Sequence, residues 1–125
     1  MDYVTTVRVL VRESREPLAN VRVELFDRDQ HSADDSLGFL ITNKTGEVIF
    51  KYTTADFADG IMGSDDGFAL GKKRDTIPDL YVVVYDKDER IVIDQREETV
   101  ENFAATHIVV LIDEALVQQY RLGTP

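Results

Sequence analysis

Apolar and polar residues alternate along most of this chain, and a period of two is typical of a strand with one buried face. The run Val21-Arg22-Val23-Glu24-Leu25 alternates most cleanly, which predicts that Arg22 and Glu24 face outward. β-Branched and aromatic residues fill the apolar positions, as they do on pleated surfaces. The pattern predicts seven strands, at about residues 4–12, 21–25, 37–42, 47–52, 80–85, 90–94 and 107–112.

The segments between these runs carry turn signals. Asn43-Lys44-Thr45-Gly46 places glycine where a tight hairpin needs a positive φ, and residues 86–89 form a second short hairpin loop. No long helical period separates the runs, and many short strands with such turns favour a sandwich or a barrel. We therefore predict one all-β domain over residues 1–125, with its core at about 4–112 and its strands antiparallel.

Two segments depart from the alternation. Residues 54–79 form a long connection rich in Gly and Asp, and connections of this length are usually functional or disordered. At the C-terminus, Asp113 suits an N-cap, Glu114 suits the first turn and Gly123 suits the position after the helix. These signals predict a short helix over about residues 114–122.

The predicted strands 80–85 and 107–112 are apolar on both faces, although an outer face of a sandwich is normally wet. Something is therefore expected to cover them. The first expectation is that the C-terminal helix folds back over this surface. The alternatives are a neighbouring domain, or a homodimer formed through the outer face of these two strands.

Composition excludes several classes of function. The net charge of −10 argues against nucleic acid as a partner, because phosphate binding requires a basic patch. The absence of cysteine excludes disulfides and thiolate chemistry and slightly favours a reducing, cytoplasmic location. We see no secretory signal in Met1-Asp2-Tyr3 and no apolar run long enough to span a membrane. No Gly-x-Ser-x-Gly elbow, phosphate-binding loop or zinc motif is present.

Three motifs resemble a known superfamily. Residues 17–27, Pro-Leu-Ala-Asn-Val-Arg-Val-Glu-Leu-Phe-Asp, resemble the entry to its second strand. Residues 42–50, Thr-Asn-Lys-Thr-Gly-Glu-Val-Ile-Phe, resemble its next hairpin, and residues 79–86 resemble a later strand. The chain thus resembles the transthyretin-like (prealbumin-like) sandwich, including the carboxypeptidase regulatory-like modules, over about residues 5–112. The resemblance implies a seven-stranded Greek-key sandwich with an accessory, non-catalytic role.

One branch of that superfamily, 5-hydroxyisourate hydrolase, is an enzyme. Its active site uses a His on the first strand, a later His and a C-terminal Tyr-Arg-Gly-Ser. Tyr120-Arg121-Leu122-Gly123 is similar to that tail, and His107 is the candidate for the later His. The predicted first strand, 4–12, has no His, so the general-base arrangement of that enzyme is not available in the same form. A hydrolase is thus an alternative prediction, and the enzyme class is not our first choice.

Charge is expected to gather at one end of the sandwich. If successive strands alternate in direction, the connections after the second, fourth and sixth strands share an end, and these connections hold most of the excess Asp and Glu. Calcium binds six to eight hard oxygen ligands from flexible loops. Residues 27–38 also resemble the third calcium loop of C2 domains, which predicts these tentative ligands: Asp27, Asp29, Asp34, Asp35, Asp65 and Asp66.

We therefore predict a non-enzymatic binding or accessory module, which presents its acidic loop end and its 54–79 loop to a protein partner or a neighbouring domain. Rigid sandwiches with variable loops suit that task. The alternative is a C2-like calcium-binding module, with Ca²⁺ as its one cofactor. A solvated acidic rim, which keeps the domain soluble, is the simplest reading of the same carboxylates.

Overall fold

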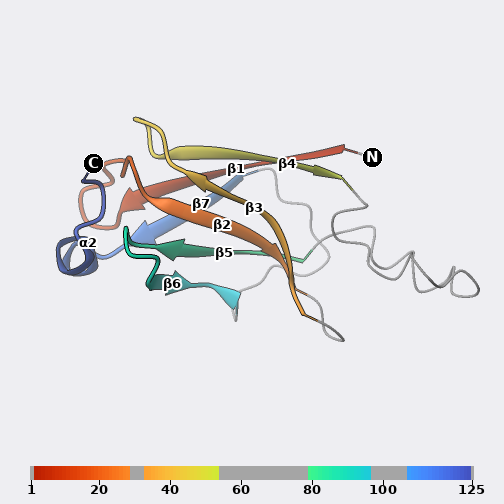
Figure 1. The fold of residues 1–125 in the computed structure, drawn as a ribbon. Coiled ribbons are helices and arrows are strands. Elements are labelled where there is room, and N and C mark those ends of the chain that lie inside the picture. Colours follow the sequence, from red (N-terminus) through yellow and green to blue (C-terminus); the bar gives the residue numbers. More distant parts are fainter. Residues whose placement is uncertain (1, 29–32, 54–78, 97–106, 125) are drawn as a thin grey trace, which may run out of the picture.

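A computed structural model describes residues 2–28, 33–53, 79–96 and 107–124 of the chain. Within these ranges it forms two β-sheets and one short helix (Figure 1). The fold is therefore the all-β sandwich with a C-terminal helix that the alternation predicts. The elements are β1 (Asp2–Val11), β2 (Arg22–Asp27), β3 (Asp35–Ile41), β4 (Glu47–Thr53), β5 (Leu80–Tyr85), β6 (Ile91–Asp94), β7 (His107–Ile112) and α2 (Glu114–Tyr120).

The two sheets have the strand orders β4-β1-β7 and β3-β2-β5-β6. Every neighbouring pair is antiparallel except β1 and β7, which run parallel. The expectation of a wholly antiparallel sandwich is therefore wrong for one pair. The reason is that strand direction alternates along the chain, so the first and seventh strands point the same way when they become neighbours.

The core fills the space between the two sheets. Each sheet contributes the apolar residues of one strand face, as the clean alternation of β2 and β4 requires. The largest fully buried side chains in it are Phe50, Leu25, Ile112, Val7, Val9, Val21, Val23, Val82, Val84 and Val110. One polar pair also lies there, since the hydroxyls of Thr5 and Tyr52 share a 2.7 Å hydrogen bond. This bond compensates for the burial of both groups.

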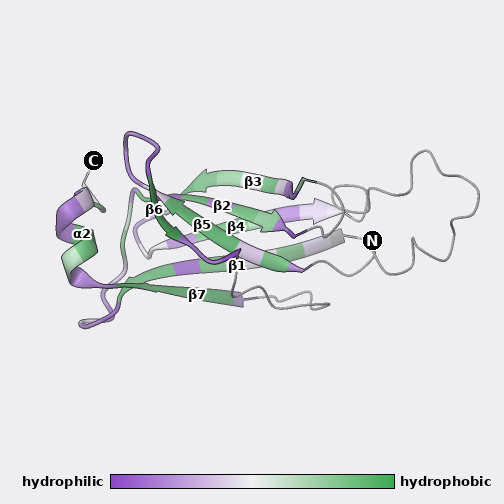
Figure 2. Ribbon diagram, turned by 90° about the horizontal axis from the view of Figure 1, so that it is seen from below, coloured by the Kyte–Doolittle hydropathy of each residue, from purple (hydrophilic) through white to green (hydrophobic). Residues whose placement is uncertain are grey.

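The helix α2 closes one end of the sandwich (Figures 1 and 2). Leu116, Val117 and Tyr120 pack against the core from that end, and Leu122 is buried in it. The predicted cap at Asp113 is in the right position, but its side chain makes no capping hydrogen bond. Asp113 instead pairs with Arg12 at 2.6 Å.

The helix is capped differently from the prediction at both ends. The carboxylate of Glu13 accepts a hydrogen bond from the first helical N–H, that of Glu114, at 2.9 Å. At the other end, α2 stops at Tyr120, because Arg121 adopts the left-handed conformation with φ of 55°. The sequence instead favoured Gly123 as the terminating residue, and that glycine also has a positive φ.

The predicted cover for the apolar strands is wrong in two respects. β5 and β7 belong to different sheets, so they share no outer face through which a homodimer could form. The helix lies at the end of the sandwich and not over either face. On the outer face of β5, Tyr81 is buried by side chains of the same sheet, and the ring of Phe26 stacks on it with the ring centroids 5.1 Å apart. On β7, Val109 remains 55% exposed.

Candidate functional site at the acidic end

One end of the sandwich gathers carboxylates, as the alternation of strand direction predicts. The ends of β2 and β6 and the starts of β3 and β5 meet there, opposite α2 (Figure 1). We call this the acidic end and define it by its described charged residues, which are Asp27, Arg28, Asp34, Asp35, Asp79, Asp94 and Arg96.

Asp34 is the centre of the best-defined polar cluster at the acidic end. Its carboxylate accepts hydrogen bonds from Nε of Arg96 at 2.7 Å and from Nη2 at 3.3 Å. The hydroxyl of Tyr81 donates to the same carboxylate at 2.5 Å. The hydrogen bond to Asp34 holds the pKa of Arg96 above its usual value. Burial, followed by the hydrogen bond to Asp34, raises the pKa of Tyr81.

A second set of bonds ties β2 to the segment that enters β5. Oδ1 of Asp27 accepts a hydrogen bond from the N–H of Asp79 at 2.8 Å. The N–H of Arg28 donates to the carbonyl oxygen of Asp79 at 2.8 Å, and Nη1 of Arg28 donates to the carbonyl of Arg96 at 3.3 Å. These contacts fix the strand ends, so the acidic end has a rigid base.

The register of β2 and β3 places two carboxylates opposite each other. Asp27 is the cross-strand partner of Asp35, at the last pair of the ladder. Like charges directly opposite on neighbouring strands are destabilising unless something compensates for them. The hydrogen bond from Asp79 to Asp27 supplies part of that compensation.

The structure places three of the six predicted calcium ligands at the same end of the sandwich. Asp27, Asp34 and Asp35 lie at the acidic end, but Asp29, Asp65 and Asp66 fall outside the described residues. Among the residues that the structure describes, no group of three or more His, Asp or Glu side chains is arranged to hold a metal ion. The calcium site therefore stays a prediction. The long connection 54–79 is also outside the described part, apart from Asp79.

The candidate hydrolase residues lie at opposite ends of the sandwich. His107 begins β7 at the acidic end, whereas Tyr120 ends α2 and Arg121 follows it at the far end. β7 alone separates the two ends by about 17 Å, at roughly 3.3 Å per residue. The geometry therefore does not assemble these residues into one catalytic site.

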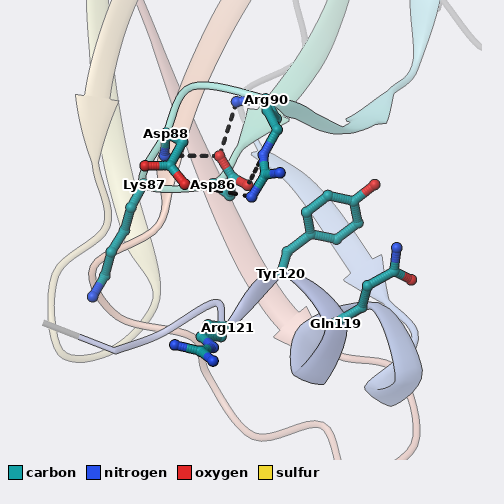
Figure 3. A pocket seen from close by; sticks show the side chains of 7 residues that line it. All are labelled: Asp86, Lys87, Asp88, Arg90, Gln119, Tyr120 and Arg121. Atoms are coloured by element: carbon teal, nitrogen blue, oxygen red, sulfur yellow. Dashed lines mark hydrogen bonds and ion pairs between the residues drawn. The ribbon is translucent and has the colours of Figure 1, made fainter.

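The far end holds a cleft of about 370 Å³ between the β5–β6 turn and α2 (Figure 3). Its buried carboxylate, Asp86, accepts hydrogen bonds from the N–H of Asp88 at 2.9 Å, and from the N–H and Nε of Arg90 at 2.8 and 3.0 Å. Burial raises the pKa of Asp86, but these hydrogen bonds outweigh it and lower the pKa overall. Asp86 thus holds the turn, which is a structural role.

The outer face of the β3-β2-β5-β6 sheet carries an aromatic surface, of which the sequence predicted the apolar outer face of residues 80–85 but not the contact with Phe39. The rings of Phe39 and Tyr85 lie 5.5 Å apart, and the Tyr85 hydroxyl donates to Glu24 at 2.7 Å. Burial, followed by the bond to Glu24, raises the pKa of Tyr85 to about 12. The alternation of the sequence places Tyr81, Val83 and Tyr85 on this face, but it carries no information on which strand supplies Phe39.

Comparison with known proteins supports the fold only. No family model matches the chain, and no curated protein matches it. Among solved structures it is similar to a 9R-lipoxygenase from Cyanothece PCC8801, with a TM-score of 0.50 and 21% sequence identity. The match covers 86% of this chain and 15% of the lipoxygenase chain, so the chain spans only a small part of that enzyme's length. At this identity the similarity supports the β-sandwich fold alone and gives no information on activity.

Proposed function

We propose that this chain is a non-enzymatic, transthyretin-like binding module that contacts a basic protein surface through its acidic end. The observation that carries the proposal is the convergence of Asp27, Asp34, Asp35, Asp79 and Asp94 on one end of a rigid sandwich. The predicted role of the 54–79 loop is consistent with this location, because β4 ends and β5 begins at the acidic end.

Charge complementarity gives this end its selectivity. A concentration of carboxylates attracts a positively charged partner and speeds its association. Arg28 and Arg96 are engaged with main-chain carbonyls or with Asp34, so they order the site and leave a negative excess around it. Asp94 is exposed at the rim of the acidic end, where a partner could reach it.

The test is a titration with an octalysine peptide, followed by backbone amide NMR shifts. We expect the shifts to concentrate at Arg28, Asp79 and Arg96, and to shrink as salt rises, because the Debye length is only about 10 Å at 0.1 M ionic strength. Asp94→Asn should weaken binding. Asp88→Asn is the matched control, since it makes the same charge change at a 78% exposed carboxylate of the far end.

Two results would contradict the proposal. One is a set of amide shifts spread evenly over the surface or centred on α2. The other is an equal loss of binding in Asp94→Asn and Asp88→Asn, because both variants have the same net charge and differ only in where the charge was removed.

A calcium-binding module is the second candidate, favoured by one specific observation. Asp27 and Asp35 face each other across the β2–β3 ladder, and a divalent cation between such carboxylates would relieve their repulsion. The ion pair of Asp34 with Arg96 opposes this candidate, since calcium would have to compete with the guanidinium for that carboxylate.

Thermal unfolding with excess calcium, against chelator and against magnesium, tests this candidate. A ligand at about 100 times its dissociation constant that binds only the folded state adds roughly 2.7 kcal/mol, which raises the midpoint by several degrees. The rise should vanish in a variant that carries Asp34→Asn and Asp35→Asn. Identical curves with calcium and with chelator would remove the candidate and leave the first proposal intact.

A further inference from the structure

The edge strand β3 exposes three consecutive large apolar residues. Phe39 is 44% exposed, Leu40 is 40% exposed and Ile41 is 53% exposed. Successive strand residues point to opposite faces, so this run leaves apolar surface uncovered on both sides of the edge. A run of exposed consecutive apolar residues is normally avoided unless it serves a function.

The main chain of β3 also presents hydrogen-bonding groups to the open edge. The N–H of Thr42 donates to the carbonyl oxygen of Val21, and the carbonyl of Thr42 accepts from the N–H of Asn20. Both groups of Thr42 therefore point toward the β2 side. Because the direction of these groups alternates along a strand, those of Leu40 also point to β2, and those of Phe39 and Ile41 point away from it. In the part of the chain that the structure describes, no strand pairs with β3 on that side.

Two of the other three sheet edges carry features that discourage pairing. β4 has charged residues at Glu47 and Lys51, and β6 is only four residues long and ends in Asp94. On β7, Val109 is the single large apolar residue that is strongly exposed. Charges and short lengths are the devices by which natural edge strands avoid unwanted pairing, and the segment from Leu37 to Ile41 has neither.

We propose that two copies of this chain pair through β3, antiparallel and centred on Leu40, so that their four-stranded sheets join into one continuous sheet. In this register Phe39 of each copy lies opposite Ile41 of the other. The edge-facing N–H and C=O groups of these residues then meet as two complete hydrogen-bonded pairs. Their side chains form aromatic and β-branched cross-strand pairs, which stabilise a sheet.

The distribution of charge allows a second copy in this arrangement despite the net charge of −10. No charged residue lies between Leu37 and Ile41, so none is desolvated at the centre of the contact. The acidic end of each copy lies beyond its Asp35. The antiparallel register places the two Asp35 residues about 33 Å apart, at roughly 3.3 Å per residue, which exceeds the Debye length at physiological salt.

The test is sedimentation velocity over a wide range of protein concentration, with the wild type and two variants. We expect the wild type to shift from monomer to dimer as its concentration rises. Ile41→Lys should remain monomeric, because pairing would bury two lysines at the contact. Val109→Lys is the matched control, with a β-branched residue of 55% exposure on the edge of the other sheet, and it should still dimerise. A wild type that stays monomeric, or a Val109→Lys variant that loses the dimer, would overturn the proposal.

Amide hydrogen exchange in the wild type gives an independent readout that does not depend on the folding of a variant. The N–H groups of Phe39 and Ile41 should exchange several-fold more slowly at high than at low protein concentration. The N–H of Leu40 should exchange at the same rate at both, since it already bonds to β2. Concentration-independent exchange at Phe39 and Ile41 would refute the pairing, including the case in which a dimer forms through another surface.

Discussion

An added methyl group at Gly38 is expected to be costly, because the ring of Phe50 from the opposite sheet packs against this residue. A Cβ at Gly38 would lie 2.8 Å from Cδ1 and 3.1 Å from Cε1 of Phe50. Phe50 is almost fully buried, so its ring has no room to withdraw. Gly38 also has a φ of 150°, which side-chain-bearing residues rarely adopt. The residue lies next to the register shift between β2 and β3.

We therefore expect Gly38→Ala to lower the free energy of unfolding by two separable amounts. Overpacking of the core costs about 1–3 kcal/mol, and the unfavourable backbone conformation costs about 1–3 kcal/mol more. The assay is urea unfolding followed by circular dichroism. With a slope of about 1–3 kcal/mol per molar, the midpoint should fall by about a molar or more.

Two controls separate these amounts. Gly123→Ala has a comparable backbone penalty, since its φ is 85°, but its Cβ would meet nothing closer than 3.4 Å. It should therefore cost less than Gly38→Ala. Adding Phe50→Leu to Gly38→Ala should relieve the clash, with a coupling of about 0.5–3 kcal/mol. Strictly additive effects at positions 38 and 50, or equal losses at positions 38 and 123, would refute the steric argument.

Two further predictions follow from the shifted pKa values. Burial and then the hydrogen bond to Glu24 raise the pKa of Tyr85 to about 12, above its usual value near 10, so the neutral hydroxyl contributes stability below pH 10 that is lost as the pH rises from 10 to 12. The difference in stability between the wild type and Tyr85→Phe should thus narrow over that range in urea unfolding, and a constant difference would contradict the assignment. Asp86 has a lowered pKa, so its stabilisation of the β5–β6 turn is present above its usual pKa near 4 and is lost on further acidification. Asp86→Ala should lower the thermal midpoint at pH 7, and should lower it less at pH 2.

The individual strands could be predicted because each has a strong local pattern. In β2 and β4 the buried and less buried residues alternate along the whole strand, as their sequences require. The direction of successive strands could also be predicted, because each turn or connection reverses the chain. That single rule explains why Asp34, Asp79 and Asp94 meet at one end, although Asp34 and Asp79 come from two different connections and Asp94 from the end of β6.

The sheet to which each strand belongs could not be predicted from local pattern. β5 and β7 are both apolar on two faces, yet β5 is central in one sheet and β7 is an edge of the other. The pairing of Asp34 with Arg96 was equally hidden, because it joins residues 62 positions apart whose individual types suggest only solvated loops. Such contacts depend on which strands become neighbours, and composition carries no signal for that choice.

The two proposed contact surfaces are expected to respond to salt in opposite ways, because they use different parts of the same fold. Binding of a basic partner at the acidic end depends on Coulomb attraction, so it should weaken as ionic strength rises. Pairing through Phe39 and Ile41 buries apolar surface between two molecules of like charge, so added salt should screen their repulsion and leave the attraction intact. The acidic ends stay outermost in the paired arrangement, which leaves them accessible. Octalysine binding that falls with salt while the dimer persists or strengthens would therefore assign each contact to its own surface.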